Sequence, residues 1–152
     1  MAVKMPPIEK IHEAYGAIAD DRITLRENEA DIVSSDLSKT YLVTWNEKNV
    51  YTSNDNASYW QGYAGYPILA VLMLQNKLSL NREIAGHFKG IDWKKRNTAH
   101  KNKYAEVVKE IMDELNTLGV DTEKINQEIQ KVYKEIETLE ISTKRSALRP
   151  PK

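Results

Sequence analysis

The chain contains no cysteine among its 152 residues. This absence excludes disulfide bonds, thiolate catalysis, and zinc or iron–sulfur sites built on cysteine. The three histidines, at positions 12, 87 and 100, show no metal-ligand spacing among themselves. We therefore expect neither a bound metal nor another cofactor.

An excess of one charge and a long apolar run are also missing. Lysine plus arginine total 22 and aspartate plus glutamate total 22, so no overall field draws the chain to nucleic acid or to a membrane. No apolar stretch reaches the roughly 18 to 20 residues that a membrane span needs. The start, MAVKMPPIEK, lacks the apolar core of a secretory signal. We expect a cytoplasmic protein without a membrane partner.

Common catalytic motifs are absent as well. The chain has no phosphate-binding P-loop, dinucleotide glycine fingerprint, HExxH or G-x-S-x-G. Glu83 and His87 are one helical turn apart, a spacing that is more typical of a surface contact than of a catalytic pair. We therefore predict a non-catalytic protein with no catalytic residues.

The most informative stretch is residues 51–74, YTSNDNASYWQGYAGYPILAVLML, which we call the central segment. Its end, residues 68–74, is apolar on every side and predicts a buried helix. Pro67 suits the first turn of that helix, because its missing N–H would be unpaired there anyway. Gly62 and Gly65 allow the backbone to turn and to approach neighbours closely.

The order of these parts resembles the SWIM zinc-finger domain, in which Cys-x-Cys, a Pro-Asp-aromatic spacer and Cys-x-His lead into an Ile-Leu-Ala-Val helix. In the best register these positions fall on Asn54 and Asn56, residues 57–59, Gly65 and Pro67, and residues 68–71. The resemblance covers roughly residues 15–78 and departs from the family at every metal ligand. It implies a metal-free relative of the SWIM fold. An unrelated strand–turn–helix core with the same propensities is the alternative.

The residues before the central segment predict one helix and then a small sheet. Residues 7–19 carry apolar side chains at helical spacing, with His12 expected on the surface or near a cap. The period then changes to two. Four strands are predicted at residues 22–26, 30–34, 39–45 and 50–53. They form an antiparallel meander, one face of which should pack on the buried helix.

The residues after the central segment are helical. Two apolar seams follow the heptad spacing: Tyr104, Val108, Ile111, Leu115 and Leu118, then Ile125, Ile129, Val132, Ile136 and Leu139. A short connection around Gly119 predicts an antiparallel helical hairpin. The fold class is therefore α+β, with a small antiparallel β-meander packed on a buried helix and a C-terminal helical hairpin. We divide the chain into a SWIM-like core with its N-terminal helix (1–78), a helical extension (79–141) and a disordered basic tail (142–152).

Two functions from different classes fit this organisation. The first is an interaction module that recognises a protein partner, or a second copy of the chain as a homodimer, through Tyr59, Trp60 and Tyr63. The same rings, Trp60 above all, could instead fill the core. The second is DNA or RNA binding by the basic stretch 87–104, where lysine and arginine would contact phosphates and aromatic rings would stack on bases. Its candidate residues are Trp93, Lys94, Lys95, Arg96 and Lys101.

Overall fold

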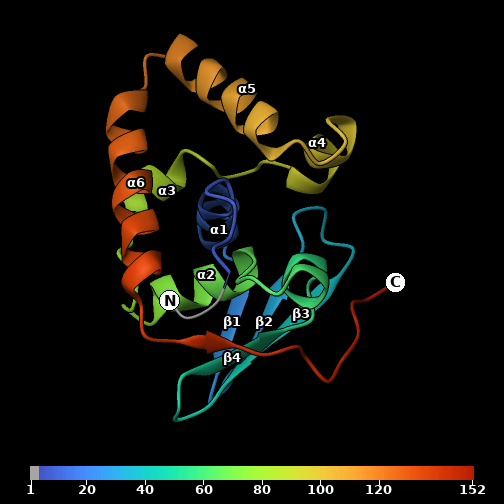
Figure 1. Ribbon diagram of the computed structural model, residues 1–152. Helices are drawn as coiled ribbons and strands as arrows, with labels where there is room; N and C mark the ends of the chain where they lie inside the picture. The colour runs from blue at the N-terminus through green and yellow to red at the C-terminus, as the bar shows by residue number, and fades with distance from the viewer. Residues whose placement is uncertain (1–3) are drawn as a thin grey trace.

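The computed structural model describes residues 4–152 and has an α+β fold (Figure 1). Its elements, in chain order, are α1 (Lys10–Ala19), β1 (Ile23–Arg26), β2 (Glu29–Val33), β3 (Thr40–Trp45), β4 (Val50–Ser53), the π-helical turn η1 (Ala57–Gln61), α2 (Tyr66–Leu74), α3 (Arg82–Gly86), α4 (Trp93–Ala99), α5 (Tyr104–Thr117), α6 (Thr122–Thr138) and β5 (Ser142–Thr143).

The predicted meander is confirmed. Strands β1 to β4 pair in chain order, each antiparallel to the one before. Inward positions alternate along β2 and β3, which bury Ala30, Ile32, Tyr41 and Val43, because successive side chains of a strand point to opposite faces. The sheet therefore has one face in the core.

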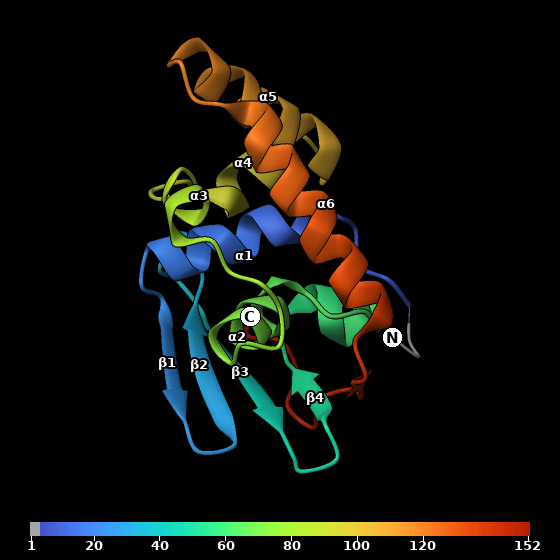
Figure 2. The ribbon, with the colours of Figure 1, turned by 90° about the vertical axis from the view of Figure 1, so that its left-hand side faces the viewer.

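The buried helix predicted from the apolar run is α2, with Pro67 in its first turn. Every residue from Pro67 to Met73 is buried, since α2 packs on β3 and β4 on one side and on α1 on the other. Figure 2 shows this arrangement, with the sheet below α2 and α1 above it. The prediction that the meander packs on this helix is confirmed.

The C-terminal helices α5 and α6 follow one another through a short connection, and then diverge (Figure 1). Along α6 the predicted seam is buried at Ile125, Ile129, Val132 and Ile136. Along α5 the seam was partly wrong: Val107 is buried in place of Val108, and Leu118 is 78% exposed. The physical reason is that the two helices also pack on different partners, α4 for α5 and α1 for α6, so their stripes do not face each other throughout.

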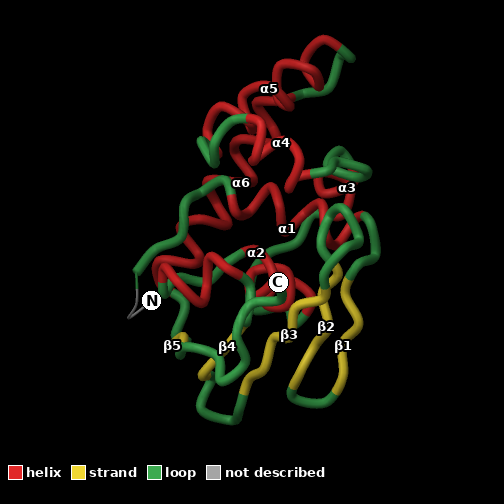
Figure 3. The backbone as a smooth tube through the Cα atoms, turned by 90° about the vertical axis from the view of Figure 1, so that its right-hand side faces the viewer, coloured by secondary structure: helices red, strands yellow, loops and turns green. Residues whose placement is uncertain are grey.

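The first two residues of the predicted disordered tail (142–152) form a strand. Strand β5 pairs in parallel with β4, and the N–H of Ser142 donates to the Asn49 carbonyl at 3.0 Å (Figure 3). The chain then runs past η1, where the guanidinium of Arg145 lies 4.9 Å from the ring centroid of Tyr59. Low apolar content suggested disorder, but the open edge of β4 supplies backbone hydrogen bonds that composition does not reveal.

His12 was expected on the surface and is 3% exposed. Its ring meets Phe88 edge-on, with the centroids 5.5 Å apart. Helix α1 contacts α2, α3 and α6, so its polar flank is covered as well as its apolar stripe. The sequence pattern assumes that only one face of this helix is covered. His12 was therefore placed on the surface, although neighbouring helices cover it.

Within residues 4–152, none of the helices combines the length and the apolarity that crossing a membrane requires.

Candidate functional site

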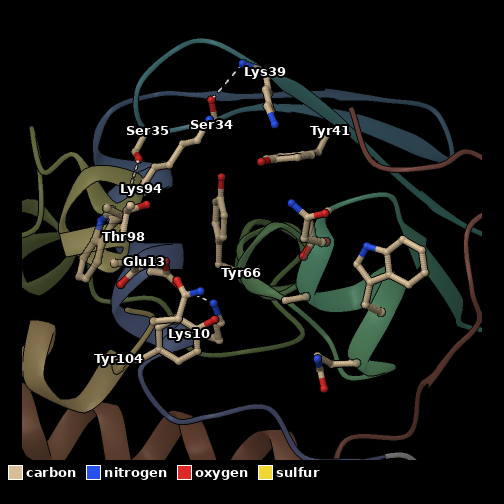
Figure 4. Close-up of a pocket in the computed structure, with 18 of the residues that line it drawn as sticks. Lys10, Glu13, Ser34, Ser35, Lys39, Tyr41, Tyr66, Lys94, Thr98 and Tyr104 are labelled. Atoms are coloured by element: carbon tan, nitrogen blue, oxygen red, sulfur yellow. Dashed lines mark hydrogen bonds and ion pairs between the residues drawn. The ribbon is translucent and has the colours of Figure 1, made fainter. Parts of the chain in front are cut away.

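A cavity of about 330 Å³ opens between α1, the β2–β3 end of the sheet, η1, α4 and the start of α5 (Figure 4). Both sets of residues that the sequence pointed to contribute to its wall. Trp60 and Tyr63 come from the central segment, whereas Trp93 and Lys94 come from the basic stretch. Two predicted sites far apart in the chain therefore meet at one place.

Two tyrosine hydroxyl groups dominate one end of the cavity. Those of Tyr41 and Tyr66 point into the same region, beside Ser34 and Lys39 (Figure 4). Neither hydroxyl has a hydrogen-bond partner among the described residues. Burial raises the pKa of both tyrosines, with Arg22 opposing the rise at Tyr66. Both groups therefore keep their protons at neutral pH and are available as donors.

Arg22 brings a buried cation to the same wall and is 6% exposed. Its Nη1 donates to the Val33 carbonyl at 2.7 Å, and its Nε donates to Asp20 at 3.2 Å. Its Nη2 is buried and has no partner within residues 4–152. The guanidinium carbon lies 6.0 Å from the ring centroid of Tyr66, so the cation lies beside this ring.

The opposite end of the cavity holds a buried ion pair on α1 (Figure 4). Lys10 Nζ lies 2.9 Å from Glu13 Oε2 and 3.9 Å from the ring centroid of Tyr104. Burial by itself would lower the pKa of Lys10, but the carboxylate of Glu13 outweighs it and the net shift is upward. Asn97 donates to the other oxygen of Glu13 at 2.8 Å. Glu13 is therefore occupied by protein partners on both oxygens.

The second acid in the wall, Asp55, is also occupied by protein groups. It accepts from the hydroxyl of Ser53 and, at 3.1 Å, from the N–H of Ser58. The hydroxyl of Ser58 in turn accepts from the N–H of Gly65 at 2.9 Å. We call these four residues the Asp55 corner, because they join the end of β4 to η1 and to the start of α2.

The Asp55 corner lies where the SWIM register would place zinc ligands. Asn54 uses its side-chain oxygen to accept from the Leu42 N–H at 2.7 Å, and Asn56 is exposed. Gly65 and Pro67 begin α2. No three histidine, aspartate or glutamate side chains gather into a possible metal site in the described part of the chain. Backbone and side-chain hydrogen bonds connect the strand and the helix here.

The wall of the cavity has more cations than acids. Four cations, Lys10, Arg22, Lys39 and Lys94, line it with two acids, Glu13 and Asp55. Arg22 and Lys94 also pair with Asp20 and Asp36, which do not line it. Both lining acids are already hydrogen-bonded within the protein, whereas Lys39 Nζ makes a single long bond, 3.3 Å, to the Pro151 carbonyl. The cavity therefore offers more unused donors than acceptors.

The three aromatic residues of the predicted partner surface separate in the structure. Trp60 is 58% exposed and lines the cavity, so the alternative that this ring fills the core is wrong. Tyr63 is 5% exposed and lines the cavity from inside. Tyr59 is partly buried and holds Trp60 from the side, with ring centroids 4.7 Å apart at 77°. Only Trp60 therefore offers a large exposed ring.

The five residues predicted for nucleic-acid contact also have different surroundings. Trp93 is buried and stacks on Phe88. Lys94 pairs with Asp36 at 3.3 Å, and Arg96 pairs with Glu110 and Glu114 of α5 at 3.0 and 3.1 Å. Lys95 and Lys101 are exposed. The acids of α5 thus compensate part of the basic stretch.

Several lining residues were not among the predicted site residues, although one of them, Tyr66, belongs to the central segment. They are Lys10, Arg22, Lys39, Tyr41 and Tyr66. Each occupies an ordinary position on a helix, a strand or a turn, and no short spacing joins them. Alternation along β3 could indicate that Tyr41 points inward, but not that its hydroxyl would remain without a partner.

A family model described as "Uncharacterised conserved protein UCP014422" matches residues 3–142. The chain belongs to this family. The matched range contains every cavity-lining residue, from Lys10 to Tyr104, so the cavity lies within the region that the family model describes. No curated protein and no solved structure matches the chain. The description of the family names no activity, so the function is argued from the geometry of the site.

Proposed function

We propose that the protein is a non-catalytic binding module whose cavity takes a small organic anion. The observation that supports this most directly is the group of donors at one end: the hydroxyls of Tyr41 and Tyr66 and the ammonium of Lys39, with the guanidinium of Arg22 beside them. A carboxylate or phosphate placed here would accept hydrogen bonds from these donors, and the bond from Lys39 would be charge-assisted.

The size and walls of the cavity fit the same proposal. Its volume of about 330 Å³ is at the small end of the range for ligand pockets. Trp60, Tyr63 and Tyr104 line it with ring surface, which suits a ligand with a planar apolar body. The ligand class is therefore an organic molecule with one anionic group and one planar part.

The donor group can be tested by removing two hydroxyls without changing the rings. In the double variant Tyr41→Phe, Tyr66→Phe, we expect affinity for benzoate and for inorganic phosphate to fall by about 10-fold or more, since two hydrogen bonds to the anion are lost. Isothermal titration calorimetry at low and at high salt measures this. Stability should not fall, because no hydrogen bond within residues 4–152 is broken.

Tyr59→Phe is the matched control, because it removes a tyrosine hydroxyl near the cavity but outside its wall. Its affinity for both anions should equal that of the unmodified protein. The proposal would be contradicted if the double variant bound the anions as tightly as the unmodified protein. It would also be contradicted if the unmodified protein bound neither anion at millimolar concentration.

A second candidate function is binding of a protein partner or of a second copy of the chain. The exposed ring of Trp60 supports it. The contact would use Trp60 with Tyr59 beside it. Sedimentation velocity of the protein and of Trp60→Ala distinguishes the two proposals. Concentration-dependent association that the variant loses would favour self-association, whereas the anion-binding proposal expects one unchanged species.

A further inference from the structure

We infer that the anion is a nucleoside monophosphate, with its base stacked on Trp60 and its phosphate at the donors of Tyr41, Tyr66 and Lys39. This inference rests on the proposed function and names the ligand of the same cavity. Three independent features carry it: an immobilised exposed ring at the rim, free amide groups at the ends of the turn that carries that ring, and the donors at the other end of the cavity.

Trp60 is held in place although more than half of it is exposed. Tyr59 meets it edge-on, and the guanidinium of Arg145 lies 5.8 Å from its ring centroid. Trp60 lines both the cavity and the neighbouring hollow that holds Arg145, so it stands between them. A ring fixed in advance loses little freedom when a base stacks on it, and any base provides a suitable face.

Two amide side chains lie at the ends of the same turn. Asn56 precedes η1 and Gln61 ends it, and both are exposed and line the cavity. Neither side chain has a hydrogen-bond partner in the part of the chain that the structure describes. An amide offers donors and an acceptor together, which is what the edge of a nucleobase requires. A carboxylate with a plain aromatic body would leave both amides unused.

The donors of the cavity match a phosphate monoester better than a carboxylate. Of the four cations in its wall, Lys10, Arg22 and Lys94 pair with Glu13, Asp20 and Asp36, whereas Lys39 has no acid partner among the described residues. A phosphate monoester carries about −1.5 to −2 at neutral pH and three strong acceptor oxygens, whereas a carboxylate carries one charge. The donors of Tyr41, Tyr66 and Lys39 suit several acceptor oxygens on one group (Figure 4).

The ion pairs at and beside the cavity argue for a single nucleotide over a strand. Arg96 is neutralised by two acids of α5, and Lys94 by Asp36. A strand-binding groove needs a continuous run of available cations along the backbone path. Here the run is interrupted next to the cavity.

The test compares adenosine 5′-monophosphate, uridine 5′-monophosphate, adenosine and inorganic phosphate by calorimetry on the full chain. We expect both monophosphates to bind at least about 10-fold more tightly than inorganic phosphate, because the base adds stacking. In Trp60→Leu that advantage should disappear, while the affinity for inorganic phosphate stays unchanged. Trp60→Phe should keep most of the advantage, since it retains a ring.

The outcomes separate the two proposals. In one outcome, inorganic phosphate and benzoate bind, but the monophosphates bind no more tightly than inorganic phosphate and Trp60→Leu does not change their affinity. This outcome would overturn the nucleotide inference and leave the anion-binding proposal intact. No binding of any anion would overturn both. Tighter binding of a single-stranded oligonucleotide than of either monophosphate would overturn the inference in favour of a strand-binding surface.

Discussion

Replacing Gly65 by alanine is expected to lower the free energy of unfolding by roughly 2–6 kcal/mol, the combined range for overpacking and for a broken buried hydrogen-bond network. A β-carbon at this position would lie 2.9 Å from Ser58 Oγ and closer still to Asp55 Oδ2. Neither atom can withdraw cheaply, because Ser58 accepts from the Gly65 N–H and Asp55 accepts from the Ser58 N–H. The Asp55 corner would therefore open.

The loss at Gly65 would be purely steric, since its φ of −69° suits any residue. Gly86→Ala is the matched control, because Gly86 is an exposed helical position where a β-carbon meets nothing within 4 Å. It should leave stability unchanged or raise it by up to about 1 kcal/mol. Urea unfolding followed by circular dichroism measures both. Similar losses in the two variants would show that the Asp55 corner does not control stability.

Lowering the pH from 7 to 4 is expected to reduce the free energy of unfolding by about 3 kcal/mol through protonation of His12 alone. Burial lowers the pKa of His12 to about 4, and the carbonyls of Glu9 and Ile8 oppose it only in part. The unfolded chain takes up a proton at His12 below about pH 6.5, whereas the folded protein does so only below about pH 4. The contribution of neutral His12 to the free energy of unfolding is therefore complete above pH 6.5, decreases as the pH falls, and is lost below pH 4.

The size of this effect follows from the two pKa values, since one pKa unit corresponds to about 1.4 kcal/mol. The variants His12→Leu and His12→Gln remove the titrating group. The difference in free energy of unfolding between pH 7 and pH 4 should be about 3 kcal/mol smaller in each variant than in the unmodified protein. Parallel pH profiles for the variants and the unmodified protein would rule out this role of His12. The comparison uses the change in the free energy of unfolding with pH, so it remains informative even if either variant is less stable at every pH.

Most secondary structure was predictable because it depends on local pattern. Alternation placed the four strands of the meander within about a residue of their observed bounds, and an apolar run after Pro67 indicated α2. Composition was less informative for residues 142–152, whose contacts are backbone hydrogen bonds to β4 and a guanidinium stacked on Tyr59. Such contacts depend on what the rest of the chain presents, so composition did not indicate the strand at residues 142–143.

The site was predictable only in part. Aromatic residues of the central segment and the start of the basic stretch were identified, and Trp60, Tyr63, Trp93 and Lys94 do line the cavity. Their surroundings were not identified, because the sequence left open whether Trp60 makes contacts or fills the core, and it placed Trp93, which is buried, on a binding surface. Burial of a ring depends on which elements cover it, and local composition does not give this information.

The sequence by itself determined the absence of cysteine chemistry, the balance of charge, the α+β class and the order of the elements, because each of these follows from residue types and their short-range spacing. Only the tertiary structure decided that Arg22, Tyr41 and Tyr66 meet at one cavity with unused donors, and that Glu13 and Asp55 are already occupied there. The physical reason is that whether a polar group is hydrogen-bonded depends on its neighbours in space. Here those neighbours come from α1, the sheet, η1 and α4, which are far apart along the chain.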